Sequence, residues 1–461
     1  MKRGQTDLNF LIAINKPTGM TSHDVINKIR TITGEGRVGH MGTLDPCAGG
    51  AMLIGIGSAA RLNNYLELVD KTYVVKITLG KTTNTYDLEG EVTQTSEVNS
   101  EFLQEDFVKK FLDKYVGVHT QKPPAFSAIK VDGKPAYKSA REGKNVDLPE
   151  RQIEVYSAKL LGVEGNSWEV EFEVSKGTYI RSLVHDIGQD LGCGAFVSSL
   201  VRTAIGDISL NNCYSLEDFE KDFNEGNYRV LDAADLLGFP VAEADDKLSK
   251  RVKNGNSIRN DASWNLFPGA KLSIIENNKL QAIYTMEDLH ELICECKFSG
   301  AIALPEKENF CVTLGVFDGF HEGHAFEVEE CIADAKKYDA KAVAITFDID
   351  PDELFVKDFI KLDSNEDRIA KLKASGLDEV RVLKFKEIQN LSGQEFLDKF
   401  FGPNPPKSLH VGEGFKFGKN QSGDTDLLIK WGKEHGMDVH VHELVKKDGE
   451  VISSTRLRET K

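Results

Sequence analysis

Two short turns in the sequence combine glycines with side chains that can act as acids, bases or nucleophiles. The stretch "VGHMGTLDP" (residues 38–46) holds His40 and Asp45, and "GVFDGFHEGH" (residues 315–324) holds His321 and His324 among three glycines. An aspartate before a proline is common in ordinary turns, so the first motif taken alone favours a structural role. A glycine turn that opens a helix after a strand favours a phosphate site, because free backbone N–H groups there attract anions.

Three further stretches contribute an aromatic, an acidic and a basic side chain. Tyr73 opens a predicted strand in "DKTYVV", Asp87 lies in "TYDLEGEV", and Arg181 stands at a strand-to-helix turn in "KGTYIRSLVHDIG". Each alone fits an ordinary role, as a sheet residue, a turn former or a surface charge. Their occurrence together, in this order along the chain, is what carries information.

Together these motifs resemble the tRNA pseudouridine synthase B family, from "LIAINKPTGMTSHDVINKIR" to "LVRTAIGDISL" (residues 11–210). The resemblance implies an enzyme that isomerises the T-loop uridine of tRNA to pseudouridine without a cofactor or a metal. Asp45 would be the catalytic carboxylate beside C1′ and C2′ of the ribose, acting either as a nucleophile or as a base at C2′. Arg181 would favour its ionised form, and Tyr73 would stack on the base and help to remove the C5 proton.

The target uridine lies inside a folded loop and must be extruded, so the resemblance also implies residues that hold the RNA. His40 would fill the gap that the uridine leaves. The other implied substrate- or RNA-binding residues are Asp87, Tyr179 and Lys130. The segment 122–151, with seven basic and four acidic residues, resembles the insertion that grips the RNA backbone in the family. Departures from the family pattern touch the packing of the catalytic turn: Met41, Ala48, Gly49, Ala60 and Arg61.

The second turn is followed far downstream by "HVGEGFKFGKNQSGD" (residues 410–424) and "ISSTRLRE" (residues 452–459). These three motifs resemble the FAD synthetase module of bacterial riboflavin kinase/FAD synthetases, a group of HxGH nucleotidyltransferases. The resemblance implies transfer of AMP from Mg-ATP to FMN, with His321 and His324 as donors to the phosphates where charge builds up. The implied nucleotide-binding residues are Gly315, Phe317, Asp318, Gly319, Gly323, Ser453, Ser454, Thr455 and Arg456, with Arg458 assisting.

Two places in this half depart from that family. The stretch "TFDIDP" replaces TFxPHP, so Ile349 and Asp350 stand for a proline and a histidine, and Gly414 stands for an aspartate. An alternative therefore stays open, in which the C-terminal half is a non-catalytic nucleotide-binding or interaction module. Because the chain ends at Lys461, we expect no kinase module, and so FAD made from FMN only.

Another alternative concerns the N-terminal half, which could be a tRNA-folding chaperone without turnover. The presence of Asp45, Tyr73 and Arg181 argues against it. The interpretation that we adopt is a fusion of two enzymes on two unrelated folds.

Periodicity predicts the elements that must position the first set of residues. Residues 21–34 read as a helix capped by Thr21 or Ser22, and residues 71–80 and 168–175 read as strands. In the second strand, apolar residues alternate with glutamates, which is typical of a half-buried antiparallel strand. Residues 1–235 are therefore predicted to form an α+β domain built on a largely antiparallel sheet.

The rest of the chain divides in two. Residues 236–303 combine a short basic helix with short strands and resemble a small PUA-like β domain. After a predicted linker at 304–310, strands alternate with helices over residues 308–461. This alternation predicts right-handed crossovers and a parallel, doubly wound, Rossmann-like α/β domain.

Composition narrows the class of protein further. The chain has 461 residues and a net charge of −16, which disfavours non-specific nucleic-acid binding and leaves only a local basic surface for RNA. The seven cysteines form no CxxC pair and have no histidine cluster beside them, so we expect neither disulfides nor a metal site. No long apolar run and no signal peptide are present, so we expect a cytoplasmic protein without a membrane anchor. No obligate protein partner is evident.

Overall fold

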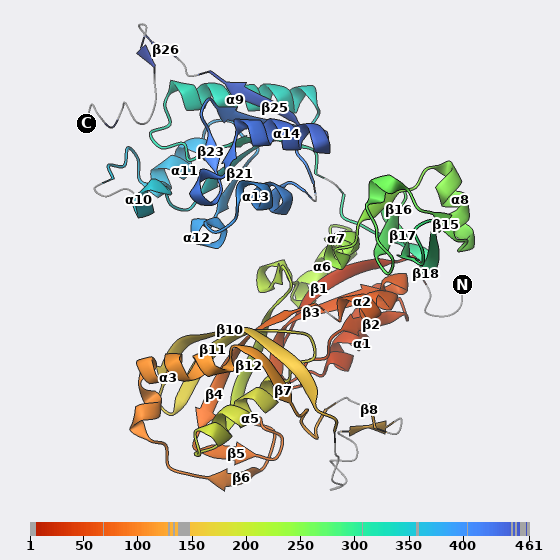
Figure 1. Ribbon diagram of the computed structural model, residues 1–461, viewed down its shortest axis with the longest axis vertical. Coiled ribbons are helices and arrows are strands. Elements are labelled where there is room, and N and C mark those ends of the chain that lie inside the picture. Colours follow the sequence, from red (N-terminus) through yellow and green to blue (C-terminus); the bar gives the residue numbers. More distant parts are fainter. Residues whose placement is uncertain are drawn as a thin grey trace. The chain divides into compact units, whose positions relative to one another are not determined.

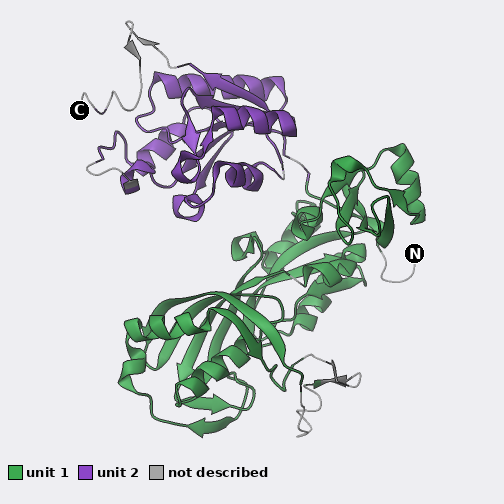
Figure 2. Ribbon diagram, viewed as in Figure 1, with its two compact units in different colours: residues 1–305 green, residues 306–461 purple. Residues whose placement is uncertain are grey.

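The computed structural model describes residues 6–67, 69–127, 130–131, 134–136, 148–306, 308–355, 359–402, 404–443, 446–447, 450–451 and 458. The chain divides into two compact units, residues 1–305 and 306–461 (Figure 2). Within the described ranges, no helix is both long enough and apolar enough to cross a membrane. All seven cysteines are free thiols.

A nine-stranded sheet forms the frame of the first unit (Figure 1). Its strands are β1 (Phe10–Lys16), β2 (Val38–Met41), β3 (Ala48–Ile56), β4 (Lys71–Leu79), β7 (Gly117–Gln121), β10 (Arg151–Glu164), β11 (Ser167–Val174), β12 (Ala195–Ile205) and β13 (Ile208–Ser209). The order is β1-β3-β12-β4-β11-β10-β7, with β2 on β3 and β13 on β12. Among the described pairings only β3 with β12 is parallel. The prediction of a largely antiparallel sheet is confirmed.

Local sequence explains the elements around this sheet. Helix α1 (Ser22–Thr33) begins at Thr21, which forms a capping box with Asp24, and ends at Gly34 in the left-handed region. In β4 every second residue is buried, which places Lys71 and Tyr73 on one face. The other helices of this unit are α2 (Asn63–Leu66), α3 (Glu105–Leu112), α5 (Ile180–Asp190), α6 (Leu216–Glu225), α7 (Ala233–Leu237) and α8 (Asp246–Asn254). Helix α3 packs on β10, and α5 packs on β12.

A second, five-stranded sheet belongs to the same unit. Its order is β14-β16-β17-β18-β15, and its strands are β14 (Val241–Glu243), β15 (Ile258–Arg259), β16 (Lys271–Ile275), β17 (Lys279–Met286) and β18 (Glu291–Ala303). The two sheets share a core, in which Leu11 and Leu53 pack in one cluster with Ile283 and Phe298. Leu304 joins this core and Phe310 begins the first strand of the next unit, β19, so the two ends of the predicted linker lie in packed structure.

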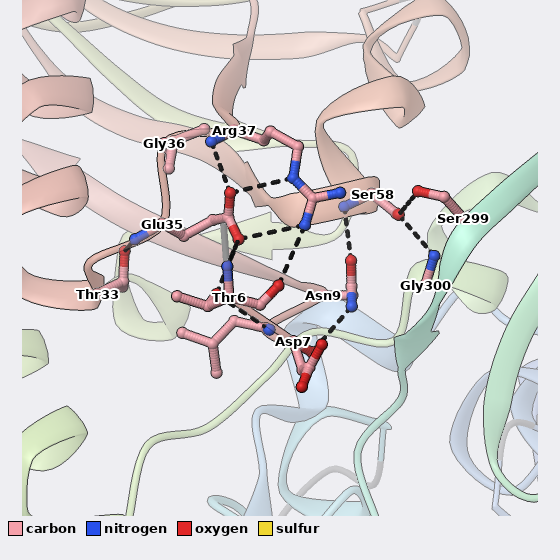
Figure 3. A network of polar contacts seen from close by, with 12 residues as sticks. Thr6, Asp7, Asn9, Thr33, Glu35, Gly36, Arg37, Ser58, Ser299 and Gly300 are labelled. Atoms are coloured by element: carbon pink, nitrogen blue, oxygen red, sulfur yellow. Dashed lines mark hydrogen bonds and ion pairs between the residues drawn. The ribbon is translucent and has the colours of Figure 1, made fainter. Parts of the chain in front are cut away.

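Polar contacts also join the N-terminal segment to this second sheet (Figure 3). The Asn9 side chain accepts from the Ser58 N–H at 2.8 Å, and the Ser58 hydroxyl lies 3.1 Å from that of Ser299. Nearby, the fully buried Glu35 carboxylate accepts hydrogen bonds from Thr6 and from the backbone and side chain of Arg37. Desolvation by itself would raise the pKa of Glu35. The hydrogen bonds to the carboxylate outweigh that effect and lower the pKa to about 2.

The second unit is built on a parallel sheet of five strands in the order β21-β20-β19-β22-β25. They are β19 (Phe310–Leu314), β20 (Lys341–Phe347), β21 (Glu379–Leu383), β22 (Ser408–Gly412) and β25 (Asp438–His442). The helices are α9 (Glu322–Lys337), α10 (Asp352–Phe355), α11 (Asn365–Lys373), α12 (Phe385–Ile388), α13 (Gly393–Phe400) and α14 (Thr425–His435). The predicted parallel sheet with alternating helices is confirmed.

Helices cover both faces of this parallel sheet. Residues of α13 and α14 pack with Val312 and Val411 in one core, whereas α9 packs with Cys311 and Ala342 on the other face. From β19 the chain adds β20 and β21 on one side of the sheet, and from β22 it adds β25 on the other side. The strand order therefore reverses between the neighbours β19 and β22. In open α/β sheets, a crevice for ligands lies at the carboxyl ends of the strands at such a switch point.

Four two-stranded pairs lie outside these three sheets. They are β5 (Lys81–Thr83) with β6 (Val92–Thr95), β8 (Lys130–Val131) with β9 (Lys134–Pro135), β23 (Lys416–Phe417) with β24 (Gly423–Asp424), and β26 (Lys446–Lys447) with β27 (Glu450–Val451).

Candidate active sites in the two units

The first unit has a cavity of about 330 Å³ where the turn before β3, strand β4 and the start of α5 meet. Four of the residues predicted to act on the substrate lie in its wall: Asp45, Tyr73, Tyr179 and Arg181. Asp45 comes from the turn between β2 and β3, Tyr73 from β4, and the other two from the first turn of α5 and its cap. The fold thus gathers residues that are up to 136 positions apart in the sequence (181 − 45).

Arg181 links the cavity to a buried carboxylate behind it. Its Nε lies 2.9 Å from Asp45 Oδ2 and its Nη1 lies 3.2 Å from Asp87 Oδ2. The guanidinium also donates to the backbone carbonyls of Thr85 and Phe126, at 3.0 and 2.9 Å. The side chains of Arg181 and Asp87 are only 4% and 3% exposed, whereas that of Asp45 is 35% exposed. Asp45 is therefore the member of this trio that a substrate can reach.

The environment of Asp45 sets its protonation. Burial raises the pKa of the Asp45 carboxyl, and the Arg181 cation opposes that shift. Asp87 accepts from the Thr85 hydroxyl at 2.6 Å and from the Glu89 N–H at 3.0 Å, which holds its carboxylate against Arg181. Asp87 itself is not in the cavity wall, so its contact with the site runs through Arg181.

Two tyrosines give the cavity its aromatic surface. Tyr73 is 8% exposed and pairs in the sheet with Phe172 on one side and Arg202 on the other. Tyr179 is held at the start of α5 because the Gln121 side chain bonds both its N–H and its carbonyl, at 2.8 and 3.0 Å. The Arg151 guanidinium lies 5.4 Å from the centre of the Tyr179 ring. Flat aromatic walls of this kind suit a nucleobase.

Other predicted RNA-binding residues lie elsewhere. His40, on β2, is not in the cavity wall; its Nδ1 is buried without a hydrogen-bond partner among the described residues, and burial lowers its pKa. The side chain of Lys130, and half of the segment 122–151 around it, fall outside the described residues. Two departures from the family pattern pack against the second sheet. Met41 is fully buried in the shared core, and Arg61 donates to the Lys297 carbonyl at 2.6 Å.

Sequence reasoning missed two cations of the cavity wall, Lys71 and Arg202. Arg202 is 1% exposed and donates to the carbonyls of Ala51 and Gly42, at 2.7 and 3.1 Å, so it ties the Asp45 turn to the sheet. Gly42 has a φ of +89°, which only glycine adopts readily. Burial lowers the pKa of Lys71 to about 8. Both cations lie within the quoted motifs. Their side chains reach the cavity wall because β4 and β12 pair in the register observed here.

The second unit has a cavity of about 310 Å³ at the switch point of its sheet. Its wall includes the segments that follow β19 and β22, the first turn of α9, and Arg458. Of the predicted nucleotide-binding residues, Gly315, Phe317, Asp318 and Gly323 lie in this wall; Gly319 does not. Ser453, Ser454, Thr455 and Arg456 fall outside the described residues.

His321 and His324 stand together at the beginning of α9. Their rings stack at 3.9 Å between centroids, and both line the cavity. His321 is the N-cap residue and His324 lies in the first turn, where the backbone N–H groups of a 16-residue helix have no partner within the helix. Burial lowers the pKa of both histidines, that of His324 to about 3. Both imidazoles are therefore neutral at pH 7, and each can donate one N–H.

Asp350, which stands where the family has a histidine, faces an arginine. The Arg458 guanidinium lies 2.6 Å from Asp318 Oδ2 and 3.5 Å from Asp350 Oδ2, so one cation faces both carboxylates. Asp318 also accepts from the N–H groups of Leu362 and Asp363. Burial raises the pKa of Asp350, and Arg458 opposes that shift. Asp350 thus lies in the cavity wall and is balanced by a nearby cation.

Gly414 and Glu327 complete the wall. Gly414 has a φ of +80°, and a Cβ built there would meet nothing within 4 Å, so the missing aspartate leaves open space. Glu327, on α9, was not singled out from the sequence. Burial raises its pKa to about 7. Its place one helical turn after His324, on the same face, is the signal that could have identified it.

Models of known protein families match both units of the chain. The model of the TruB family pseudouridylate synthase N-terminal domain matches residues 30–180, and that of the tRNA pseudouridylate synthase B C-terminal domain matches residues 181–234. The FAD synthetase model matches residues 303–456.

Curated relatives match the first unit. A tRNA pseudouridine synthase B of Bacillus cereus is 39% identical over 261 residues, covering 54% of this chain and 84% of the relative. One of Thermosipho melanesiensis is 39% identical over 241 residues, covering 52% and 78%. Among solved structures, an H/ACA RNP bound to a substrate RNA containing 2′-deoxyuridine matches at 21% identity and a TM-score of 0.47. That match covers 63% of this chain and 84% of the other.

Proposed function

We propose that this chain, which belongs to the tRNA pseudouridine synthase B family and carries an FAD synthetase domain in its second unit, is an enzyme with two activities. The first unit isomerises a T-loop uridine of tRNA to pseudouridine. The second transfers AMP from ATP to FMN, giving FAD and pyrophosphate.

In the first reaction the bond between C1′ and N1 of the uridine breaks, the base turns, and a bond forms between C1′ and C5. The C5 proton leaves and N1 gains a proton, so that the product is an isomer of the substrate. Asp45 acts beside C1′ and C2′. Tyr73 and Tyr179 line the space for the extruded base. Desolvation raises the pKa of Asp45, and the Arg181 cation opposes that shift and so favours the ionised carboxylate. The Asp45–Arg181 contact of 2.9 Å in the cavity wall is the observation that carries this proposal.

The test uses a T-loop stem-loop labelled with tritium at C5 of the target uridine, because turnover releases that label to water. Asp45→Asn should abolish release while RNA binding stays near wild type. Glu67→Gln is the matched control, since Glu67 is the other carboxylate in the cavity wall and is exposed. Turnover near wild type in Asp45→Asn would remove Asp45 from the chemistry.

In the second reaction an oxygen of the FMN phosphate attacks the α-phosphorus of ATP, and pyrophosphate leaves. The first turn of α9 and the neutral imidazoles of His321 and His324 supply N–H donors to the phosphates. Magnesium arrives with ATP as part of the substrate, and the Asp350 and Asp352 carboxylates in the wall are oxygen ligands of the kind it prefers. The pair of stacked histidines at the switch point carries this proposal.

Incubation of the whole chain with ATP, Mg²⁺ and FMN should yield FAD and pyrophosphate in equal amounts. His324→Ala should lower the rate by roughly 10- to 1,000-fold, the scale for losing one donor aimed at developing charge. If wild type binds ATP and makes no FAD, the second unit is instead a nucleotide-binding module.

Four finer points belong to the same proposal. The second sheet of the first unit is a PUA-like module that adds RNA contacts, and residues 308–461 are a Rossmann-like HxGH nucleotidyltransferase domain. The remaining RNA contacts come from His40 and Lys130, and the buried Asp87 acts on the site through Arg181. The protein works in the cytoplasm, where its tRNA substrate and FMN are found.

A further inference from the structure

A cluster of histidines and one aspartate lies in the second unit, between α9 and two strands of the sheet. His410 on β22 pairs in register with His440 on β25, and His442 follows two residues later on the same face. Asp334 projects from α9, which packs on β22. The residues come from three elements and are up to 106 positions apart in the sequence (440 − 334), so they form no motif along the chain.

Three atoms of this cluster converge. Asp334 Oδ2 lies 3.4 Å from His410 Nε2 and 3.1 Å from His440 Nε2, and the three atoms all lie within 4.8 Å of one another. A tetrahedral metal ion with bonds of about 2.0–2.2 Å separates neighbouring ligand atoms by about 3.3–3.6 Å. The observed spacings of 3.4 and 3.1 Å are close to the edges of such a tetrahedron.

Two of these atoms have their polar contacts only within the cluster. Asp334 Oδ2 and His440 Nε2 are buried, and among the described residues their contacts are with each other and, for Asp334, with His410, at the distances of ion pairs and without the geometry of a good hydrogen bond. Buried polar atoms in native structures nearly always have well-directed partners, so these atoms call for an explanation. A metal ion between them would satisfy both at once.

The hydrogen bonds around His410 suit a ligand role. His410 Nδ1 lies 3.0 Å from His442 Nε2, so a proton on Nδ1 leaves the lone pair of Nε2 free to bind a metal. The Ser408 hydroxyl, 3.0 Å from Nε2, now contacts that lone pair and can rotate away when an ion takes its place. His410 is fully buried, whereas the His440 side chain is 42% exposed, which leaves an approach from solvent and a fourth position for water.

We propose that Asp334, His410 and His440 bind one divalent first-row transition-metal ion such as Zn²⁺. The fourth coordination position of the ion is open to solvent. The proposal does not depend on the function assigned to either unit. Two imidazoles and one carboxylate are a ligand set for such ions and not for Mg²⁺ or Ca²⁺, which prefer oxygen. His442 lies in the wall of the second cavity, so the His410–His442 contact makes the ion a positioning element for that wall.

The experiment uses the untagged whole chain, stripped of metal with a chelator and then titrated with Zn²⁺. One tight site per chain is expected, with Zn²⁺ retained after dialysis and with an increase in the unfolding temperature of the second unit. Asp334→Asn and His440→Gln should each weaken Zn²⁺ binding by more than about 100-fold, because even second-shell partners of metal ligands are worth 10- to 100-fold.

Two matched controls change the same chemical groups outside the cluster. Glu329→Gln lies on an exposed face of α9, and His290→Gln is exposed in the first unit; both should leave the Zn²⁺ affinity unchanged. Co²⁺ added to the stripped chain should give visible absorption bands of tetrahedral cobalt that Asp334→Asn abolishes. The proposal is wrong if the stripped chain retains no Zn²⁺. It is equally wrong if Zn²⁺ binding survives Asp334→Asn and His440→Gln but is lost in His321→Ala, which would place the ion at the other histidine pair.

Discussion

Replacing Arg181 by glutamine should be costly for the first unit, because a buried carboxylate depends on this cation. The change removes the contacts with Asp45 and Asp87, at 2.9 and 3.2 Å, and two hydrogen bonds to backbone carbonyls. Asp87, 3% exposed, then remains as a buried charge without its counter-ion. Breaking such a pair from one side costs about 3–5 kcal/mol, which is roughly 10²- to 10⁴-fold in the unfolding equilibrium.

The same substitution should also change the chemistry. Arg181 is the main influence that lowers the pKa of Asp45 against the effect of burial. Without it, that pKa rises further and a smaller fraction of Asp45 is ionised at neutral pH. We therefore expect the acid side of the pH–rate profile for pseudouridine formation to move to higher pH in Arg181→Gln, beyond any loss of stability.

The assay is urea unfolding followed by tryptophan fluorescence in a Trp431→Phe background. The two remaining tryptophans, Trp168 and Trp264, then report on the first unit alone, which matters because a chain of two units need not unfold in one step. Asp87→Asn combined with Arg181→Gln should recover part of the lost stability, since it neutralises the stranded charge. A cost below about 1 kcal/mol for Arg181→Gln, or a double variant no more stable than the single one, would refute the account of a buried charge held by Arg181.

The remaining predictions concern pH and folding. Glu35, with a pKa of about 2 in the fold against an ordinary 4.5, contributes stability that is present above pH 4.5 and is lost as the pH falls toward 2. The difference in unfolding free energy between wild type and Glu35→Gln should therefore shrink over that window. Glu327, whose pKa of about 7 lies above its ordinary 4.5, contributes stability below pH 4.5 that is lost as the pH rises through 7. In Glu327→Gln, the unfolding temperature of the second unit should therefore fall less between pH 4.5 and pH 7 than in wild type. An equal fall in both proteins would contradict the burial of Glu327. Residues 306–461 expressed alone should fold and unfold cooperatively, because their core is their own; a chain without a thermal transition would show that they need the first unit.

Much of the fold could be predicted because it is encoded in contiguous residues. The capping box at Thr21, the alternation of apolar residues and glutamates in β11, and the strand–helix alternation after Phe310 are patterns that burial and hydrogen bonding impose locally. The two glycine-rich turns could also be found in the sequence, since each turn with its acid or histidines occupies about ten residues. These local patterns therefore predicted the type of sheet in each unit and the turns that line the two cavities.

The tertiary structure decided which side chains meet across those elements. Arg202 enters the wall of the first cavity only because β12 pairs with β4, and Arg458 faces Asp350 across 108 positions of sequence. The cluster of Asp334, His410 and His440 exists because parallel pairing sets two histidines side by side beneath α9. Periodicity tells which face a residue occupies, but the register between strands and the packing of helices are set by contacts between distant segments. Local patterns therefore predict the elements and the motifs, whereas the charge balance around each site and the candidate metal ligands depend on contacts that form only when distant segments pack together.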